Sequence, residues 1–372
     1  MRPELVRGRV VTPGGVIEDG LVRIAGDRIV GVGPAGRTRA AVRRAAWVIP
    51  GFVDIHVHGG GGHSFAGVGD EARAAADFHT GHGTTTMLAS LVSGPPARLR
   101  TAVDGLRPLV DAGVLAGVHL EGPYLSEARR GAHDPTHLRD PDLAELTALL
   151  DLGGIRMVTL APERPGALDA IRLLRERGVV AAVGHTDATY EETVAAIDAG
   201  AGVGTHVLNG MRPPHHRDPG PVVALLDAPG VVCEQISDGV HLHAGMLRHV
   251  VRTSGPERVA LVTDAMAAAG MPDGRYELGG RAVSVSQGVA RLVADGAIAG
   301  STVTMDAAVR HAVHCGIDLV DVVTMAATTP ARVLNLQAEV GAIVVGHRAD
   351  LVLLDEELRV VDVLRRGEPY RS

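Results

Sequence analysis

The sequence predicts an α/β protein in which a (β/α)8 barrel, like a TIM barrel, is joined to a small β-sandwich built from both chain ends. From residue 48 to about residue 336, short apolar segments alternate with segments rich in Ala, Leu and Arg, a pattern typical of repeated β-α units. Short β-like segments occur before this region and again after it. A chain of 372 residues is long enough to bury a large core and a smaller second one.

The two chain ends together predict the sandwich. Strands are expected at residues 5–11, 20–25, 28–32, 351–355 and 359–364. The three N-terminal strands form no stable core alone, so the C-terminal ones are their expected partners. We therefore assign residues 1–48 and 337–372 to the sandwich and residues 49–336 to the barrel.

The middle of the chain contains eight candidate strands, the number that forms a (β/α)8 barrel. They are residues 52–58, 84–89, 115–120, 155–160, 179–184, 202–206, 231–236 and 259–263. Helices are expected at 97–111, 143–151, 167–177, 191–199, 244–253, 302–315, 319–327 and 330–334, and a β-hairpin excursion at 271–295. A doubly wound open sheet is the alternative, but no Gly-x-Gly-x-x-Gly motif follows the early strands of this middle region.

Composition limits the possible partners and location. A net charge of −7 argues against nucleic acid, which requires a basic surface. No apolar run in the sequence approaches the roughly 18 residues of a membrane span, and the first residues lack the apolar core of a signal peptide. The two cysteines, Cys233 and Cys315, are expected to be buried thiols. We therefore predict a cytoplasmic protein that binds neither nucleic acid nor membrane.

Histidine and carboxylate side chains lie at the ends of the predicted barrel strands. His56 and His58 are two residues apart on one strand, so their side chains point the same way. Other strands end at Glu121, His185, His206 and Asp264. Because the C-terminal strand ends of a barrel form one rim, these groups are expected to meet there. Nitrogen and carboxylate ligands of this kind suit Zn²⁺ or Fe²⁺.

At this point the residues resemble a known family. The segment Pro-Gly-Phe-Val-Asp-Ile-His-Val-His-Gly at residues 50–59 is similar to the opening motif of the metal-dependent amidohydrolase superfamily. That resemblance implies a (β/α)8 barrel with a β-sandwich made from both termini. Many members bridge two metal ions with a carboxylated lysine, but this chain contains no lysine, and Glu121 is the available replacement.

Further segments resemble the N-acetylglucosamine-6-phosphate deacetylase family within this superfamily. They are His-Leu-Glu-Gly-Pro at 119–123, Thr-His-Val-Leu-Asn-Gly-Met at 205–211, Ser-Asp-Gly-Val-His at 237–241, Leu-Val-Thr-Asp-Ala at 261–265 and Ala-Gly-Ser at 299–301. The resemblance covers nearly the whole chain. It implies hydrolysis of the N-acetyl amide of an amino-sugar phosphate to glucosamine 6-phosphate and acetate.

The resemblance also implies a role for each site residue. One divalent ion, Zn or Fe, is expected on Glu121, His185 and His206, and a second on His56 and His58, with Glu121 bridging and Asp264 adjoining; one or two ions per subunit remain open. Asp264 is the expected acid–base residue, and His133 the contact to the substrate carbonyl. Substrate binding is expected from Asn209, Gly210, Arg217, His241 and Ala299. The family is dimeric, and Arg217 is expected to reach the neighbouring subunit's site.

The sequence is also compatible with other functions. N-acetylgalactosamine 6-phosphate differs from the first substrate in one hydroxyl, which no motif distinguishes. Another amidohydrolase, such as a cyclic-amide hydrolase or a nucleobase deaminase, would keep the metal ligands without a phosphate site. A non-catalytic assembly protein on the same scaffold is the third possibility, but such proteins usually lose ligands, and here every ligand is present.

Overall fold

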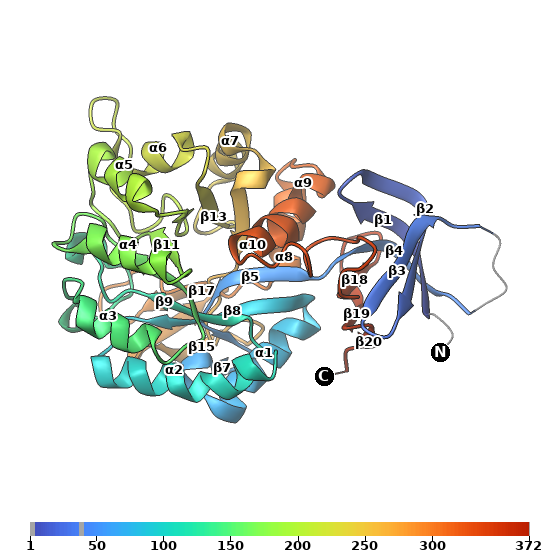
Figure 1. The fold of residues 1–372 in the computed structure, drawn as a ribbon, viewed down its shortest axis with the longest axis horizontal. Helices are drawn as coiled ribbons and strands as arrows, with labels where there is room; N and C mark the ends of the chain where they lie inside the picture. The colour runs from blue at the N-terminus through green and yellow to red at the C-terminus, as the bar shows by residue number, and fades with distance from the viewer. Residues whose placement is uncertain (1–3, 37–40, 372) are drawn as a thin grey trace.

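The computed structural model describes residues 4–36 and 41–371, in which a barrel lies beside a smaller sheet (Figure 1). The smaller sheet has seven strands in the order β20-β19-β18-β4-β1-β2-β3. Their bounds are β1 (Glu4–Thr12), β2 (Gly15–Ala25), β3 (Arg28–Pro34), β4 (Arg43–Pro50), β18 (Leu351–Leu354), β19 (Val360–Arg365) and β20 (Glu368–Pro369). Strand β18 pairs antiparallel with β4, which confirms that both chain ends build this unit.

The small sheet differs in detail from the expected arrangement. Six of its strands contribute side chains to one apolar core that includes Val6, Val22, Val48 and Leu351. One continuous sheet therefore provides the core expected of a sandwich. Strand β4 is additional: its first residues, Arg-Arg-Ala-Ala, show no apolar alternation that predicts a strand. The expected boundary between residues 48 and 49 falls inside it.

The barrel contains all eight expected strands, in chain order and parallel to one another. They are β5 (Phe52–Val57), β8 (Thr84–Val92), β9 (Gly117–Glu121), β10 (Ile155–Leu160), β11 (Val180–Val183), β12 (Val203–Gly204), β13 (Val232–Ile236) and β14 (Val259–Val262). The (β/α)8 prediction is confirmed. Their C-terminal ends form one rim, which is where side chains from different strands can meet.

The first and last barrel strands meet through polar contacts at this rim. The Asp264 N–H donates to the carbonyl of His56 at 2.8 Å. Below it, the buried Asp54 carboxylate accepts from the Thr263 hydroxyl at 2.6 Å and from the backbone N–H groups of His56 and Thr263. Burial raises the pKa of Asp54 to about 7 in spite of these bonds. These contacts between the first and last strands fix the distance between the strand that carries His56 and His58 and the strand that precedes Asp264.

The helices cover the outside of the barrel. They are α1 (Gly69–Gly81), α2 (Pro96–Asp111), α3 (Leu143–Leu150), α4 (Ala167–Glu176), α5 (Tyr190–Ala199), α6 (Gly220–Asp227), α7 (Ala244–Ser254), α8 (Met305–His314), α9 (Leu319–Val323), the π-helical turn η5 (Thr324–Thr328) and α10 (Thr329–Val333). Helix α4 buries Ala167, Ala170, Ile171 and Leu174, the spacing of one helical face. Nowhere in residues 4–36 and 41–371 does a helix reach the length and apolarity needed to cross a membrane.

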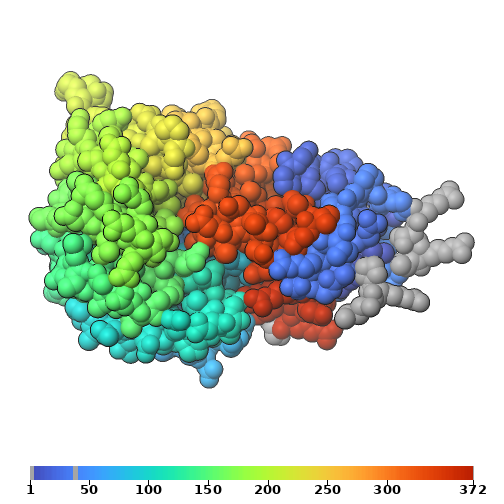
Figure 2. Space-filling view, viewed as in Figure 1, coloured from blue at the N-terminus to red at the C-terminus, as the bar shows by residue number. Residues whose placement is uncertain are grey.

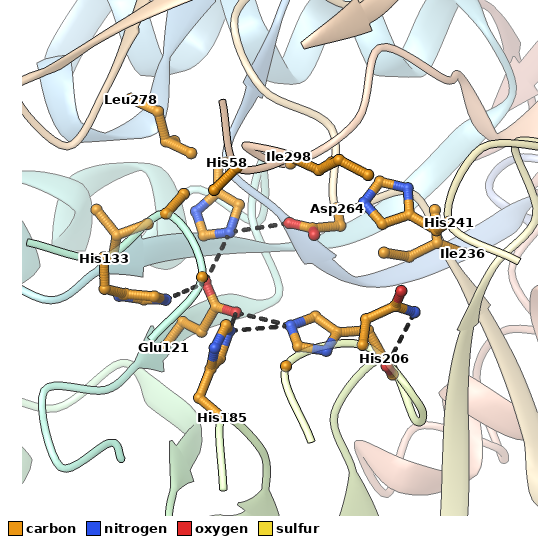
Figure 3. A pocket seen from close by; sticks show the side chains of 17 residues that line it. His58, Glu121, His133, His185, His206, Ile236, His241, Asp264, Leu278 and Ile298 are labelled. Carbon is orange, nitrogen blue, oxygen red and sulfur yellow. Dashed lines mark hydrogen bonds and ion pairs between the residues drawn. The ribbon is translucent and has the colours of Figure 1, made fainter. Parts of the chain in front are cut away.

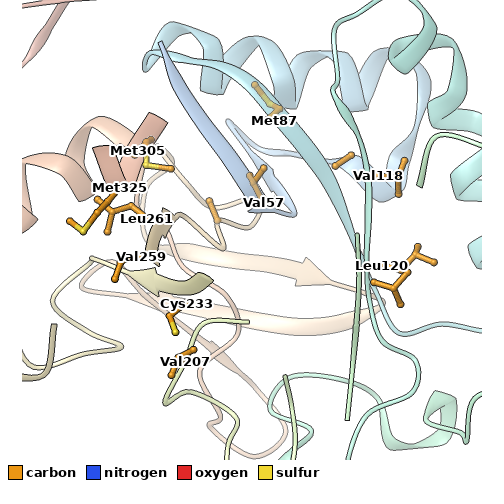
Figure 4. Packing of buried hydrophobic residues seen from close by; sticks show 14 of the residues in the cluster. Val57, Met87, Val118, Leu120, Val207, Cys233, Val259, Leu261, Met305 and Met325 are labelled. Carbon is orange, nitrogen blue, oxygen red and sulfur yellow. The ribbon is translucent and has the colours of Figure 1, made fainter. Parts of the chain in front are cut away.

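Two aliphatic cores hold the strands in place. Side chains such as Val53, Ile55 and Met157 fill the barrel interior. An outer core lies between strands and helices, where Leu261 of β14 packs near Met305 of α8 and Met325 of η5 (Figure 4). Few aromatic residues are available, so the cores consist largely of Val, Leu, Ile and Ala. Dense packing on both faces makes the strand ends a rigid support for functional groups.

The expected β-hairpin excursion is a three-stranded antiparallel sheet. It consists of β15 (Gly274–Leu278), β16 (Arg281–Ser286) and β17 (Val289–Leu292). Met266, Val283, Leu292 and Ala299 form its own small core. Because this sheet follows β14, it lies over the rim and contributes a wall to the cavity described below. A shorter hairpin, β6 (Gly59–Gly60) with β7 (His63–Ser64), follows β5.

Candidate active site

Two groups of three side chains at the rim are each close enough to hold one ion. The described residues that form them are His56, His58 and Asp264 in one group and Glu121, His185 and His206 in the other. All six are buried. They come from the ends of β5, β9, β11, β12 and β14, as the strand pattern predicts. The structure therefore brings together residues that are more than 200 positions apart in the sequence.

Glu121 is the centre of the first group. Its Oε1 lies 2.9 Å from His185 Nε2 and 3.0 Å from His206 Nε2, and these two nitrogens are 3.2 Å apart. Three potential ligand atoms thus face one small volume (Figure 3). One carboxylate and two imidazoles leave a fourth position open for water or substrate, as in catalytic zinc sites.

Glu121 also contacts the second group. His56 Nε2 lies 3.2 Å from His58 Nε2. Asp264 Oδ1 lies 3.2 Å from His58 Nε2 and 3.5 Å from His56 Nε2. The second oxygen of Glu121, Oε2, is 3.2 Å from His58 Nε2. Glu121 therefore stands between the two groups, in the position of a bridging ligand.

Hydrogen bonds on the far side of two imidazoles fix which nitrogen faces the site. His58 Nδ1 lies 3.1 Å from the carbonyl of Ser90, and His185 Nδ1 lies 2.8 Å from the carbonyl of Arg129. A carbonyl only accepts, so each Nδ1 carries the proton and each Nε2 presents its lone pair to the site. This arrangement is typical of metal-binding histidines.

Buried negative charge gives the site an affinity for cations. Burial lowers the pKa of His56, but the charges of Glu121, Asp264 and Glu234 outweigh it and raise that pKa well above its ordinary value. Burial also lowers the pKa of His58, but hydrogen bonds to Asp264 and Glu121 outweigh this effect and raise that pKa to about 9. The carboxylates therefore require positive charge nearby. The donor set, its tautomers and its charge all fit a divalent metal ion.

His133 lies beside the two groups but presents a proton rather than a lone pair. Its Nδ1 accepts from the backbone N–H of Ser93 at 3.3 Å and lies 2.9 Å from the Ser93 hydroxyl. Burial lowers the pKa of His133 to about 4, although Glu121 opposes this. The ring is therefore neutral at pH 7 with its proton on Nε2, which lies 3.4 Å from Glu121 Oε2. That N–H is a hydrogen-bond donor directed into the cavity.

Three of the rim residues adopt an uncommon backbone conformation. The φ angles are 47° at His185, 28° at His206 and 47° at Asp264. Residues other than glycine rarely adopt positive φ, and such strain persists only where the surroundings enforce it. Each of the three lies two positions after the last residue of a barrel strand, so the turn directs the side chain toward the rim centre.

A cavity of about 270 Å³ opens next to these groups. Its wall includes His58, Glu121, His133, His185, His206 and Asp264 on one side and Leu278, Ile298 and Gly300 of the hairpin region on another. Figure 3 shows these side chains directed toward a common space. The volume is close to the lower end of the range for small-molecule sites.

The cavity wall also includes three residues with expected binding roles. Asn209, Gly210 and His241 all line it. A Cβ on Gly210 would lie 2.8 Å from His185 Nδ1, so only glycine fits there. Burial lowers the pKa of His241, but its 2.7 Å bond to Asp238 and that carboxylate's charge raise the pKa above its ordinary value. His241 therefore favours the cationic form, which suits an anionic ligand.

Two residues with expected binding roles lie away from the cavity of their own chain. Arg217 is exposed in the loop between β12 and α6, the yellow-green projection in Figure 2, and its Nη1 is 2.7 Å from His216 Nε2. Ala299 is buried in the hairpin core, and its neighbours Ile298 and Gly300 form the wall instead.

Comparison with known proteins identifies the family. The amidohydrolase family model matches residues 47–369. The chain belongs to the amidohydrolase family. Its fold, with a barrel and a sheet built from both termini, is that of solved deacetylase structures in this family.

Three similar proteins show how far the likeness extends. N-acetylgalactosamine-6-phosphate deacetylase of Escherichia coli O157:H7 is 38% identical over 97% of each chain. N-acetylglucosamine-6-phosphate deacetylase of Lysinibacillus sphaericus is 35% identical over 86% of this chain and 84% of its own. An Asp-to-Ala mutant of N-acetyl-D-glucosamine-6-phosphate deacetylase from Mycobacterium smegmatis, solved in complex with N-acetyl-D-glucosamine-6-phosphate, is 48% identical, with full coverage of both chains and a TM-score of 0.97.

Two residues of this amidohydrolase site were not predicted from the sequence. Glu234 contacts His56 and the backbone of His206, and Ser93 contacts His133. A charged residue inside the otherwise uncharged strand Val-Cys-Glu-Gln-Ile is a signal that could have identified Glu234. No comparable signal distinguishes Ser93 from other serines that follow strands.

Proposed function

We propose that this amidohydrolase removes the acetyl group from N-acetylglucosamine 6-phosphate, giving glucosamine 6-phosphate and acetate. The observation that carries the proposal is one cavity that combines a candidate metal centre, a neutral His133 donor and the carboxylate of Asp264. The deacetylases among its relatives support the choice of substrate. N-acetylgalactosamine 6-phosphate is a second candidate, because the relative from E. coli O157:H7 carries that name.

The candidate ligands would supply the activation that amide hydrolysis needs. We assign one divalent ion, Zn or Fe, to Glu121, His185 and His206, and a second to His56, His58 and Asp264. Such an ion lowers the pKa of water and polarises a carbonyl group. Metal analysis of protein purified without oxygen distinguishes zinc from iron. The buried, unpaired thiols of the two cysteines suit a reducing compartment, which supports a cytoplasmic location.

The chain's own residues then move the protons. Asp264 lies at the cavity, and burial raises its pKa less than His56 and His58 lower it, so the carboxylate is ionised and can accept a proton from water. His133 donates its Nε2–H to the carbonyl oxygen as negative charge develops there. Asp264 finally returns the proton to the departing amine nitrogen. Because His133 is neutral throughout, it stabilises the oxygen without competing for the proton.

A substrate comparison tests the proposed reaction. Acetate release is expected to be fastest from N-acetylglucosamine 6-phosphate or its galactosamine isomer, with kcat/KM at least about 10²-fold lower for the unphosphorylated sugar, because charge-assisted bonds to phosphate contribute several kcal/mol. Equal kcat/KM values with and without phosphate would contradict a sugar-phosphate deacetylase. Turnover of a cyclic amide or a nucleobase in place of either sugar would favour the alternative amidohydrolase functions.

We further propose a homodimer in which Arg217 binds the substrate phosphate of the neighbouring subunit. Arg217 is exposed on a projecting loop and lies off the cavity of its own chain, whereas Asn209, Gly210 and His241 line that cavity. This geometry supports a contribution to another subunit's site rather than its own.

Mixed dimers test this arrangement. Arg217→Ala is expected to raise KM with little change in kcat, and Asp264→Asn to lose turnover. Mixing the two variants and allowing subunits to exchange should restore a fraction of sites with wild-type KM, since a mixed dimer contains one site with both residues. Sedimentation of the protein checks the dimer. No recovery on mixing, with exchange verified, would show that Arg217 acts within its own chain or not at all.

A further inference from the structure

Glu234 contacts both groups of candidate metal ligands through a single oxygen atom. It lies in β13 with its side chain fully buried. Its Oε2 accepts from His56 Nδ1 at 3.0 Å and from the backbone N–H of His206 at 3.1 Å. Its Oε1 has no hydrogen-bond partner among the residues that the structure describes. The residue does not line the cavity, so any effect on the site passes through the two histidines.

The two bonds have different consequences. At His56 the carboxylate holds the proton on Nδ1, so that the lone pair of Nε2 faces the space it shares with His58 and Asp264. A carboxylate partner also makes an imidazole a stronger metal ligand. At His206 the bond holds the backbone N–H of a residue whose φ is 28°. Among the described residues none forms a hydrogen bond with His206 Nδ1, so this backbone bond helps to orient the residue from behind.

The negative charge around His56 also favours a second ion next to Glu234. Three buried carboxylates, Glu121, Asp264 and Glu234, contact the imidazoles of the two groups of ligands, in addition to Asp54, which contacts only the backbone of His56. One divalent ion at Glu121 balances only two of these three negative charges. The uncompensated charge lies beside His56, where an unpaired buried carboxylate is costly unless a cation is near.

We propose that Glu234 is a positioning residue that completes a second ion site at His56, His58 and Asp264 and couples it to the site at Glu121. The proposal deepens the function proposed above and rests on its metal dependence. It is tested by ion binding rather than by acetate release, so a deacetylase that binds a single ion would overturn this inference and leave the function intact.

Two substitutions separate the charge of Glu234 from its hydrogen bonds. Glu234→Gln keeps the shape and one acceptor but removes the charge, whereas Glu234→Leu removes both. Metal-free protein is dialysed against buffered Zn²⁺, and bound zinc per chain is measured. Wild type is expected to bind two ions. The glutamine variant should keep the ion at Glu121 and bind the second ion about 10–100-fold more weakly. The leucine variant should lose more of its affinity for the second ion.

The control removes a similar bond elsewhere. Asp306→Asn disrupts a buried carboxylate that lies 3.1 Å from His82 Nδ1 and belongs to neither group of candidate ligands, so this variant should bind both ions like wild type. In a His56→Ala background, Glu234→Gln should cause no further loss of the second ion. The Co²⁺ absorption spectrum of each variant reports the surviving site. The proposal would be overturned if Glu234→Gln and Glu234→Leu both bound two ions with wild-type affinity. It would also be overturned if the affinities for the two ions fell equally.

Discussion

Replacing Glu121 with glutamine is expected to abolish both metal binding and acetate release. Both oxygens of Glu121 face imidazole nitrogens: Oε1 those of His185 and His206, and Oε2 those of His58 and His133. An amide of the same shape has a donor where an acceptor is required, and it contributes no charge. Since a metal contributes several kcal/mol to the transition state, kcat/KM should fall at least about 10³-fold.

Metal content measured by mass spectrometry and acetate release measured by a coupled assay check this expectation together. Glu163→Gln is a control at another carboxylate, because both oxygens of Glu163 accept hydrogen bonds, from the Asp187 backbone N–H and the Thr186 hydroxyl, without contacting a candidate ligand. The control should keep both metal and most activity. If Glu121→Gln retained the wild-type metal content and rate, the metal centre would have to lie elsewhere.

Asp264→Asn is expected to reduce kcat by about 10²–10⁴-fold, the usual contribution of a general acid–base group. Asparagine has the same size and keeps one oxygen toward His58, so the folded structure and the ion at Glu121 should remain. Substrate binding should change little, because the cavity wall is preserved. The expected pattern is therefore a large loss in kcat with KM within a few-fold of wild type.

Steady-state kinetics and calorimetric titration of this variant with the sugar phosphate measure the two quantities separately. A kcat near the wild-type value would show that another group moves the proton. A variant that binds substrate normally but has lost the ion at Glu121 would show that Asp264 acts by holding metal, and the assigned proton transfer would then be wrong.

The fold was largely predictable because its signals are local. Eight short apolar strands separated by helical segments are sufficient to predict a parallel barrel, and side chains that follow parallel strands emerge at one rim. This is why His56, Glu121 and Asp264 could be expected to meet although far apart in the chain. Strand β4 was not predicted, because its arginine-rich beginning is stabilised by pairing with β1 and β18 rather than by its own pattern.

Residue type and the position of each strand end were thus determined by the sequence itself, including the absence of lysine that leaves Glu121 as the bridging candidate. Only the tertiary structure decided which nitrogen of each imidazole faces the site and that Glu234 contacts His56 across 178 positions. The physical reason is that strand periodicity is a short-range property of the chain. Hydrogen-bond partners are chosen by distances that exist only after the barrel has closed.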